Sequence, residues 1–464
     1  MKKTNKFQKT SSNWTLIGLC IGSALVVLDA NVLNVALPEI KTAFSALATD
    51  FLWILNAYTL VFAVGLLPAG IFASRFGGEF TFLLGLVIFG FSSLACALTM
   101  TAKFLIFMRI FQGIGASLLA VTGLSLISSQ YPDSKQRGYA LSIWSGVSGV
   151  GFAAGPLVGG GLISLFNWRA VFYINIPICL LVGIISFYFV IEQQISRSKK
   201  SYSMLSQIAA ILGLATFIYT TIQISNTGIT QNSIWGYLTA AVILVLLLLS
   251  ERKVAHSTNK TNLFPPKLLA NNVVDNGLFA SFVYNFGLYG MLFVFTLVFQ
   301  QTLKNSALET GLLLLPLTLV GAFTSYSIAG KLLLKYTPQN VLYKGMFFSF
   351  IGSVILLYYT VNIHYVIAVL GFIFLSFGTG LSAPSMTALV LNNAPVNYQN
   401  VSSSLVNVAR QTGGVVGTSL LGVIVAKAAI APYTTIAMAV IAVIFLLCTL
   451  VSKNTDKIEK GKNQ

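Results

Sequence analysis

"LVVLDANVLNVALPEI" (residues 25–40) places Asp29 in the middle of an apolar run whose next acidic residue, Glu39, lies at its end. Such a run is typical of a membrane-spanning helix, where an ionised carboxylate costs several kcal/mol unless it faces water or a partner. The stretch therefore predicts both a spanning helix and a site that uses a charge.

The composition of the whole chain supports a membrane protein. Of its 464 residues, 56% are hydrophobic and 8% are charged, whereas soluble domains carry about 25% charged residues. The net charge of +17 comes from short basic tracts between apolar segments rather than from one basic face. We therefore expect contact with the lipid bilayer and no nucleic-acid partner.

Apolar segments of spanning length recur along the chain. A helix needs about 20 mostly apolar residues to cross the hydrocarbon core. The sequence predicts such spans at 15–37, 52–73, 80–101, 104–129, 139–163, 169–191, 204–224, 232–250, 274–300, 308–330, 341–360, 364–391, 404–426 and 433–452.

These spans predict an all-α polytopic membrane protein of fourteen transmembrane helices. Two six-helix bundles are expected, joined by two additional helices and a charged link, and weak similarity between the halves supports related bundles. Chance similarity of helices rich in Gly, Ala and Leu remains an alternative. The predicted segments are bundles at 1–195 and 274–452, additional transmembrane helices at 196–250, a cytoplasmic link at 251–273 and a basic cytoplasmic tail at 453–464.

The basic residues predict the orientation of the chain. If both termini are cytoplasmic, most Lys and Arg residues fall in cytoplasmic loops, as the positive-inside rule requires. We therefore expect a multi-pass protein of a bacterial cytoplasmic membrane with both termini inside. The basic residues that fall outside or within spans are Lys41, Lys103, Arg109, Arg169, Lys304, Arg410 and Lys427.

Asp29 is the acidic residue deepest within a span, about 12 Å from the outer end of its helix. Burial favours its neutral form and access to water its charged form, so Asp29 is a candidate proton-coupling residue. The alternative is a structural hydrogen bond or ion pair. Asn31 and Asn34 project about 140–200° away from Asp29 around the helix, so we assign them to a substrate cavity.

Arg109 lies at a depth of roughly 8 Å in the fourth span, close to that of Asp29. The two side chains could meet if their helices are neighbours, and Gln112, one turn on, favours a polar interior face. Alternatively, Arg109 extends to the outer headgroups. Arg410 is about as deep from the cytoplasmic side, and there too both interpretations stay open.

Aromatic residues such as Tyr58 and Tyr284 could line an apolar cavity with Gln112 and Arg410, although lipid-facing positions are equally consistent with their spacing.

The predicted fifth span contains "GFAAGPLVGGG" (151–161). Glycines four residues apart permit close helix contact, and the proline predicts a bend. These glycines and the proline form a helix surface with few side chains, which serves either conformational change or packing alone. Its residues are Gly151, Gly155, Pro156, Gly159 and Gly160.

The sequence contains no recognisable catalytic or metal-binding motif. No GxxxxGK[ST] phosphate-binding loop occurs, and Cys20, Cys96, Cys179 and Cys448 lie in apolar runs without metal-binding spacing. We expect neither a cofactor nor a metal, and no enzyme activity. A proton gradient would then drive transport.

Several motifs resemble those of a known family. "LDANVLNVALP" (28–38), "RIFQG" (109–113), "GFAAGPLVGG" (151–160) and "WRAVFYINIP" (168–177) resemble signatures of the major facilitator superfamily. Within it, the chain resembles the fourteen-helix drug:proton antiporters, especially the methylenomycin-resistance-like branch. The second half is similar more diffusely, through "VYNFGLYG" (283–290), "GTGLSAPSMTALV" (378–390) and "NVARQTGG" (407–414).

The resemblance implies the major facilitator fold and export of small molecules by alternating access, with Asp29 and Arg109 in proton coupling. We expect a substrate:proton antiporter that acts as a monomer. A proton-coupled importer of a small metabolite is the nearer alternative, and a membrane-embedded enzyme the more distant one.

The loop after the second helix departs from the family pattern of Gly, an acid four residues on, Arg, Gly and further basic residues. In "GIFASRFGGEF" (70–80), Ser74 stands at the acidic position, and Gly78 and Glu79 replace basic residues. The expected cytoplasmic gate therefore lacks part of its charge; the matching residues that remain are Gly70, Arg75 and Gly77.

Overall fold

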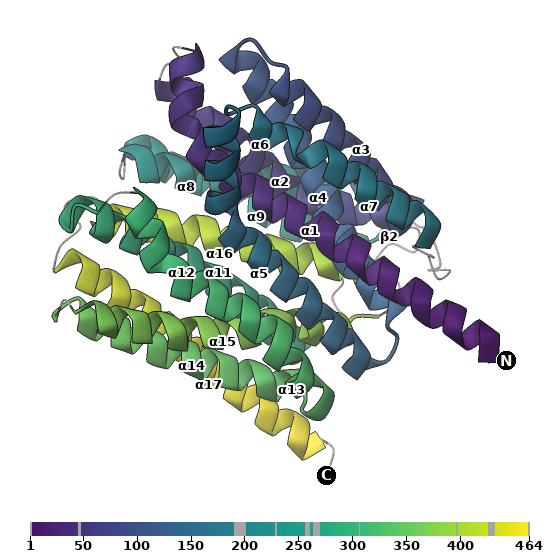
Figure 1. The fold of residues 1–464 in the computed structure, drawn as a ribbon. Coiled ribbons are helices and arrows are strands. Elements are labelled where there is room, and N and C mark those ends of the chain that lie inside the picture. Colours follow the sequence, from purple (N-terminus) through teal and green to yellow (C-terminus); the bar gives the residue numbers. More distant parts are fainter. Residues whose placement is uncertain are drawn as a thin grey trace. The chain divides into compact units, whose positions relative to one another are not determined.

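The computed structural model describes residues 2–44, 48–189, 201–227, 230–255, 260–262, 270–305, 307–362, 364–395, 398–425 and 432–462. These residues are nearly all helical (Figure 1). In this part of the chain, 13 helices are long and apolar enough to cross a membrane, and one bent helix pair adds a fourteenth. The predicted all-α membrane fold is confirmed, and the 13 or 14 candidate spans agree with the fourteen predicted.

Four of the first five helices are longer than the predicted spans, because polar helix ends extend beyond the apolar cores. The third, Gly78–Ala97, ends four residues before its predicted span does. One predicted span, 169–191, is interrupted at Ile174. Pro177 lies in the first turn of the second part, where its missing N–H cannot continue the hydrogen-bond ladder from the preceding helix. The elements are α1 (Lys2–Phe44), α2 (Ala48–Phe76), α3 (Gly78–Ala97), α4 (Ala102–Gln130), α5 (Ser134–Leu165), α6 (Ala170–Tyr173) and α7 (Asn175–Phe189).

The two additional helices, α8 (Met204–Thr227) and α9 (Gln231–Ala255), pack against each other. A short parallel pairing of β1 (Ser201–Tyr202) with β2 (Lys260–Thr261) joins the segments that flank them. Two-residue strands carry no periodic signal, so the sequence did not predict this pairing. The predicted link at 251–273 overlaps α9, and its residues 256–259 and 263–269 lie outside the described part.

The later helices include two π-helical segments that continue α-helices. The predicted tail at 453–464 continues α17 as helix to Lys462, and four of its residues are Lys, a good helix former. The elements are α11 (Asn272–Leu297), η1 (Val298–Thr302), α12 (Ala307–Phe323), η2 (Thr324–Ala329), α13 (Gly330–Lys335), α14 (Pro338–Tyr359), α15 (Tyr365–Asn392), α16 (Gln399–Val425) and α17 (Tyr433–Lys462).

The chain forms two compact units, which are not contiguous in sequence. The first unit comprises Met1–Asp133, Val147–Lys199 and Pro395–Ser404, and the second comprises Ser134–Gly146, Lys200–Ala394 and Leu405–Gln464. Helices α5 and α16 therefore contribute residues to both units. The predicted domain boundaries stay a prediction.

Helix α4 is the central element of the first unit, because it packs against α1, α2 and α3. Helix α7 packs against α1 and α3. In the second unit, α15 packs against α11, α12 and α14, and α17 packs against α11 and α14 (Figure 1). The core of the second unit is rich in buried Phe side chains, whereas the contact of α4 with α1 in the first unit brings polar residues together.

Candidate functional site

Asp29 on α1 and Arg109 on α4 form an ion pair inside the first unit. The Arg109 Nη1 atom lies 2.7 Å from Asp29 Oδ2. Asp29 is 3% exposed and Arg109 is 1% exposed. The alternative in which Arg109 extends to the outer headgroups is wrong for this structure, because the guanidinium lies within the helix bundle and bonds to the carboxylate there.

Two amide side chains complete the coordination of Asp29. Its Oδ1 atom accepts hydrogen bonds from Gln112 Nε2 at 2.9 Å and from Asn175 Nδ2 at 2.7 Å. With Arg109, three side chains donate to the carboxylate, which matches its ionised form because that form only accepts hydrogen bonds. Gln112 lies on the polar interior face that the sequence predicted.

Further groups extend this network. Ser93 Oγ accepts from Gln112 Nε2 at 2.8 Å and from Asn175 Nδ2 at 3.2 Å. Arg109 Nη1 also donates to Gln112 Oε1 at 2.7 Å, and Arg109 Nε donates to the Ile54 carbonyl at 3.3 Å. We call Asp29, Ser93, Arg109, Gln112 and Asn175 the polar cluster.

Asn175 and Ser93 were missed by sequence reasoning. Asn175 begins α7, where α7 packs against α1 and α3, and Ser93 lies on α3. Asn175 is an amide inside an otherwise apolar predicted span, within the quoted motif "WRAVFYINIP" (168–177). That is the signal that could have identified it. Burial of a neutral polar side chain in a membrane costs less free energy than burial of a charge, so it is a weaker indication of a functional site.

Tyr58 covers the polar cluster from α2. Its ring centroid lies 4.2 Å from Arg109 Cζ, its ring stacks on Phe62, and its hydroxyl donates to the Val26 carbonyl at 3.2 Å. Tyr58 is buried, so in this structure it shields the guanidinium rather than facing open space. The cation–π contact adds to the attraction that holds Arg109 in place.

The two asparagines predicted for a substrate cavity lie on α1. The Asn31 side chain donates to the Val27 carbonyl of its own helix at 2.7 Å, apart from the polar cluster. The Asn34 side chain lies outside the described residues. The assignment of both to a substrate cavity stays a prediction.

The glycines of α5 face α1 closely within the first unit. A Cβ atom on Gly155 would lie 2.6 Å from Asn31 Cβ, and Cβ atoms on Gly151 and Gly159 would lie 3.0 Å and 3.1 Å from α1 carbonyl oxygens. Gly160 differs, because a Cβ atom there would meet no atom within 4 Å. Gly151, Gly155 and Gly159 therefore form the contact face, and we call them the glycine face.

The bend predicted at Pro156 is present. Ser134–Gly155 and Leu157–Leu165 meet at an angle of 44°. The Pro156 side chain lies outside the described residues. A bend is the expected effect of proline, which removes one helical hydrogen bond and clashes with the preceding turn.

Arg410 and Tyr284 meet in the second unit. Arg410 Cζ on α16 lies 5.4 Å from the Tyr284 ring centroid on α11 and 5.8 Å from that of Trp144, which belongs to the α5 residues of this unit. The sequence predicted Arg410 and Tyr284 as candidates for the substrate cavity, but not Trp144. Trp144 is an isolated aromatic residue in "SIWSG" (142–146), and nothing in its local pattern indicates that Arg410 is its neighbour.

The chain matches a known protein family over most of its length. The model of the Major Facilitator Superfamily matches residues 19–418. The chain belongs to the Major Facilitator Superfamily. The resemblance carried by the sequence motifs is therefore confirmed, and the chain is a multi-pass membrane protein of this superfamily.

Superfamily members with similar sequences are antibiotic-resistance proteins. The methylenomycin A resistance protein of Bacillus subtilis (strain 168) is 30% identical over 431 residues, covering 92% of this chain and 91% of that protein. The Streptomyces coelicolor protein of the same name is 30% identical over 411 residues, covering 88% and 85%. The tetracenomycin C resistance and export protein of Streptomyces glaucescens is 29% identical, covering 89% and 76%.

Solved structures of the superfamily share the fold. The human organic anion transporter TETRAN superposes with a TM-score of 0.72 at 13% identity, covering 95% of this chain and 99% of that one. The proton:xylose symporter XylE superposes with a TM-score of 0.69 at 14% identity, covering 96% and 95%. At these identities the likeness concerns the fold alone.

The sequence predicts a cytoplasmic loop at 70–80, but Gly70, Ser74 and Arg75 lie in the C-terminal part of α2 (Ala48–Phe76), and Gly77 is the one residue between α2 and α3. A Cβ atom on Gly70 would collide with Ser404 Oγ and lie 2.9 Å from the Asn400 carbonyl, both within the first unit. Gly77 adopts a φ of 102°, which favours glycine. Ser74, at the acidic position, donates to the Gly70 carbonyl of its own helix at 2.8 Å.

Arg75, in the last turn of α2, is exposed, and its Cζ atom lies 5.5 Å from the centroid of the Phe76 ring. Within the described residues, Arg75 forms no ion pair. Close packing at Gly70 and the φ of Gly77 characterise this end of α2. The predicted role of Gly70, Arg75 and Gly77 as a cytoplasmic gate stays a prediction.

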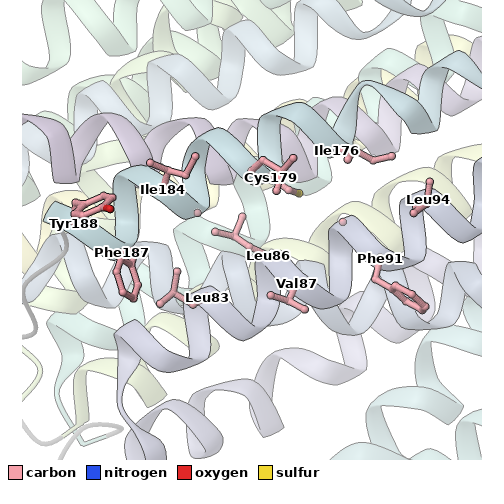
Figure 2. Close-up of a pocket in the computed structure, with 13 residues that line it drawn as sticks. Leu83, Leu86, Val87, Phe91, Leu94, Ile176, Cys179, Ile184, Phe187 and Tyr188 are labelled. Carbon is pink, nitrogen blue, oxygen red and sulfur yellow. The ribbon is translucent and has the colours of Figure 1, made fainter.

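A groove of about 590 Å³ lies between α3 and α7 on the first unit. Figure 2 shows side chains of both helices along it, including Leu83, Phe91, Ile176 and Phe187. The groove is almost entirely apolar, so it lacks groups that would orient a polar molecule. Its chemistry suits the hydrocarbon of the surrounding membrane, and we do not assign it to the functional site.

Metal chemistry finds no support in the described residues. There, no group of three or more His, Cys, Asp or Glu side chains is arranged to hold a metal ion. The four cysteines are buried and form no disulfide.

Proposed function

We propose that this chain is an exporter of drug-like small molecules that exchanges them for protons across a bacterial cytoplasmic membrane. The antibiotic-resistance names of its relatives support export. The buried pair of Asp29 and Arg109 supports proton coupling, because a membrane helix keeps an acid in its interior at considerable cost. This pair is the observation that carries the proposal.

Protonation of Asp29 is the proposed coupling step. A proton that binds the carboxylate neutralises it and leaves Arg109 charged, buried and without its ionic partner. Breaking a buried ion pair in this way is strongly unfavourable, so the protonated protein favours a conformation in which Arg109 reaches water or an anionic group. Loss of the proton restores the pair, and the polar cluster closes again.

The position of the pair couples this step to helix movement. Asp29 is on α1, whereas Arg109 and Gln112 are on α4 and Asn175 is on α7. A change in the charge of Asp29 therefore alters hydrogen bonds that join three helices of the first unit. The glycine face of α5 gives α1 a surface without side chains along which it can shift.

The proposal has three further parts, which are taken from the sequence analysis. Both termini lie in the cytoplasm, the proton gradient supplies the energy without a cofactor, and the protein acts as a monomer. Import of a metabolite is the rival function. The resistance and export names of the relatives favour export over import.

Asp29→Asn tests the coupling, because it keeps the shape of the side chain but removes its charge and its capacity to bind a proton. We expect purified Asp29→Asn in proteoliposomes to lose drug-driven proton movement, measured with a pH-sensitive dye, while its thermal unfolding stays cooperative. The matched control is Thr59→Val on α2, which removes a hydroxyl that donates to the Leu55 carbonyl of its own helix. Wild-type proton exchange by Asp29→Asn would refute coupling through Asp29.

A further inference from the structure

Arg410 is a cation in the interior of a spanning helix. It lies eleven residues after the start of α16 (Gln399–Val425) and fifteen before its end, about 16 Å and 22 Å along the helix axis. Its side chain is half-buried. Its Cα atom therefore lies about three turns from the nearer end of the helix, inside the apolar part of the span.

Aromatic rings flank this guanidinium within the second unit. Tyr284 and Trp144 lie 5.4 Å and 5.8 Å from Arg410 Cζ. Such rings attract a cation through their electron-rich faces, but a ring face is only a weak acceptor for its N–H groups. They orient the guanidinium and leave its hydrogen-bonding capacity available to another group.

No carboxylate neutralises Arg410 among the residues that the structure describes, in contrast to Arg109. The nearest acid along α11 is Asp275, in the first turn of the helix. It precedes Tyr284 by nine residues, which is about 14 Å along the axis. A half-buried positive charge in a membrane without an internal counter-charge favours binding of an anion from outside the protein.

A second polar group near Arg410 also lacks a partner. Asn285, next to Tyr284, is 3% exposed, and its Oδ1 atom accepts no hydrogen bond from the described residues. Its Nδ2 atom lies 3.8 Å from the position that a Cβ atom on Gly414 would occupy. Gly414 is one turn beyond Arg410 and on the same face of α16. A buried amide oxygen without a partner is costly, so a bound molecule that donates a hydrogen bond would stabilise it.

We infer that Arg410 binds the carboxylate of the exported molecule, so that the substrates are small organic acids with an apolar body. The guanidinium donates paired hydrogen bonds to the carboxylate oxygens. Trp144 and Tyr284 contact the apolar body, and Asn285 Oδ1 accepts a hydrogen bond from a hydroxyl or amide of the substrate. This inference rests on the proposed function and names its substrate class.

The test compares acids with compounds of other charge. The full chain is expressed in a bacterium that lacks its own drug pumps, which is challenged with nalidixic acid and fusidic acid, with neutral chloramphenicol and with cationic tetraphenylphosphonium. We expect resistance to the carboxylic acids. In inside-out membrane vesicles, nalidixic acid should compete for transport of labelled fusidic acid, whereas its ethyl ester, which lacks the charge, should not.

Variants of Arg410 test the residue itself. Arg410→Gln should raise the half-saturating concentration of the carboxylic acids at least about tenfold, and Arg410→Lys should retain part of the affinity. Lys344→Gln is the matched control, because it removes a cation that also lies over an aromatic ring, Tyr336 at 4.5 Å, elsewhere in the second unit. This control should transport the acids as the wild type does. Thermal unfolding of each purified variant shows whether it is folded.

The outcomes separate this inference from the proposed function. Export of neutral or cationic compounds alone would leave the proposed function standing and overturn the assignment of Arg410. Equal competition by nalidixic acid and its ester would overturn it as well, as would wild-type affinity for the acids in folded Arg410→Gln. If the chain exports none of the compounds, both proposals fail.

Discussion

The Arg109 guanidinium lies 2.7 Å from the Asp29 carboxylate, although 80 positions separate the two residues in the chain. Both are almost completely buried, so each charge depends on the other. A buried pair of this kind contributes little net stability compared with apolar residues, but removal of one partner is expensive. This asymmetry makes the pair suitable as a switch.

Arg109→Gln should destabilise the protein by about 3–5 kcal/mol, because it leaves the Asp29 carboxylate buried without its ionic partner. The free energy of unfolding is measured by denaturant titration of the purified variant in detergent micelles. The double variant Asp29→Asn/Arg109→Gln should recover much of that loss, since neither charge remains. If the two substitutions simply add, the residues are not energetically coupled.

Asn175→Leu should cost about 1–3 kcal/mol and impair transport, because Asp29 Oδ1 then loses one of its donors within a buried site. Unfolding and vesicle transport are both measured. Cys179→Ala, one turn along α7 and on the apolar groove, is the control and should have little effect on transport. Equal transport defects in the two variants would mean that Asn175 acts only through helix packing.

Gly155→Ala should slow transport and destabilise the protein by about 1–3 kcal/mol, because its methyl group would lie 2.6 Å from Asn31 Cβ. Gly160→Ala places the same methyl group where no atom lies within 4 Å, so its transport rate should match the wild type. Initial rates in vesicles and thermal unfolding provide the comparison. Similar rates for both variants would argue against a close contact between α5 and α1.

Gly77→Ala should lower stability by about 1–2 kcal/mol, because its φ of 102° is unfavourable for a residue with a Cβ atom. Gly183→Ala, within α7, meets no atom within 4 Å and should be neutral or slightly stabilising. Thermal unfolding of the two purified variants measures the difference. A neutral Gly77→Ala would mean that the loop readily adopts another conformation.

The sequence predicted much of the fold because the membrane imposes a simple rule. Each span needs a long apolar segment, so the fourteen helices could be located from hydropathy alone. Their ends were less predictable: α1 extends to Lys2 and α17 to Lys462, since polar residues continue a helix beyond the apolar part. The break at Ile174 and the pairing of β1 with β2 depend on local geometry that hydropathy does not record.

The candidate site was predictable only in part. Asp29, Arg109 and Gln112 stood out because charged and strongly polar side chains are costly inside a membrane, and their similar depth allowed a contact. Asn175 and Trp144 did not, because an amide or an aromatic residue within a span has many possible neighbours.

By itself, then, the sequence determined which segments cross the membrane and which buried charges need a partner, since both follow from the transfer of each residue out of water. Only the tertiary structure decided that Asn175 joins Arg109 and Gln112 at Asp29, and that the Arg410 guanidinium lies near the rings of Trp144 and Tyr284. These contacts join helices distant in the chain, and the packing of those helices, rather than the properties of any one segment, sets which side chains meet.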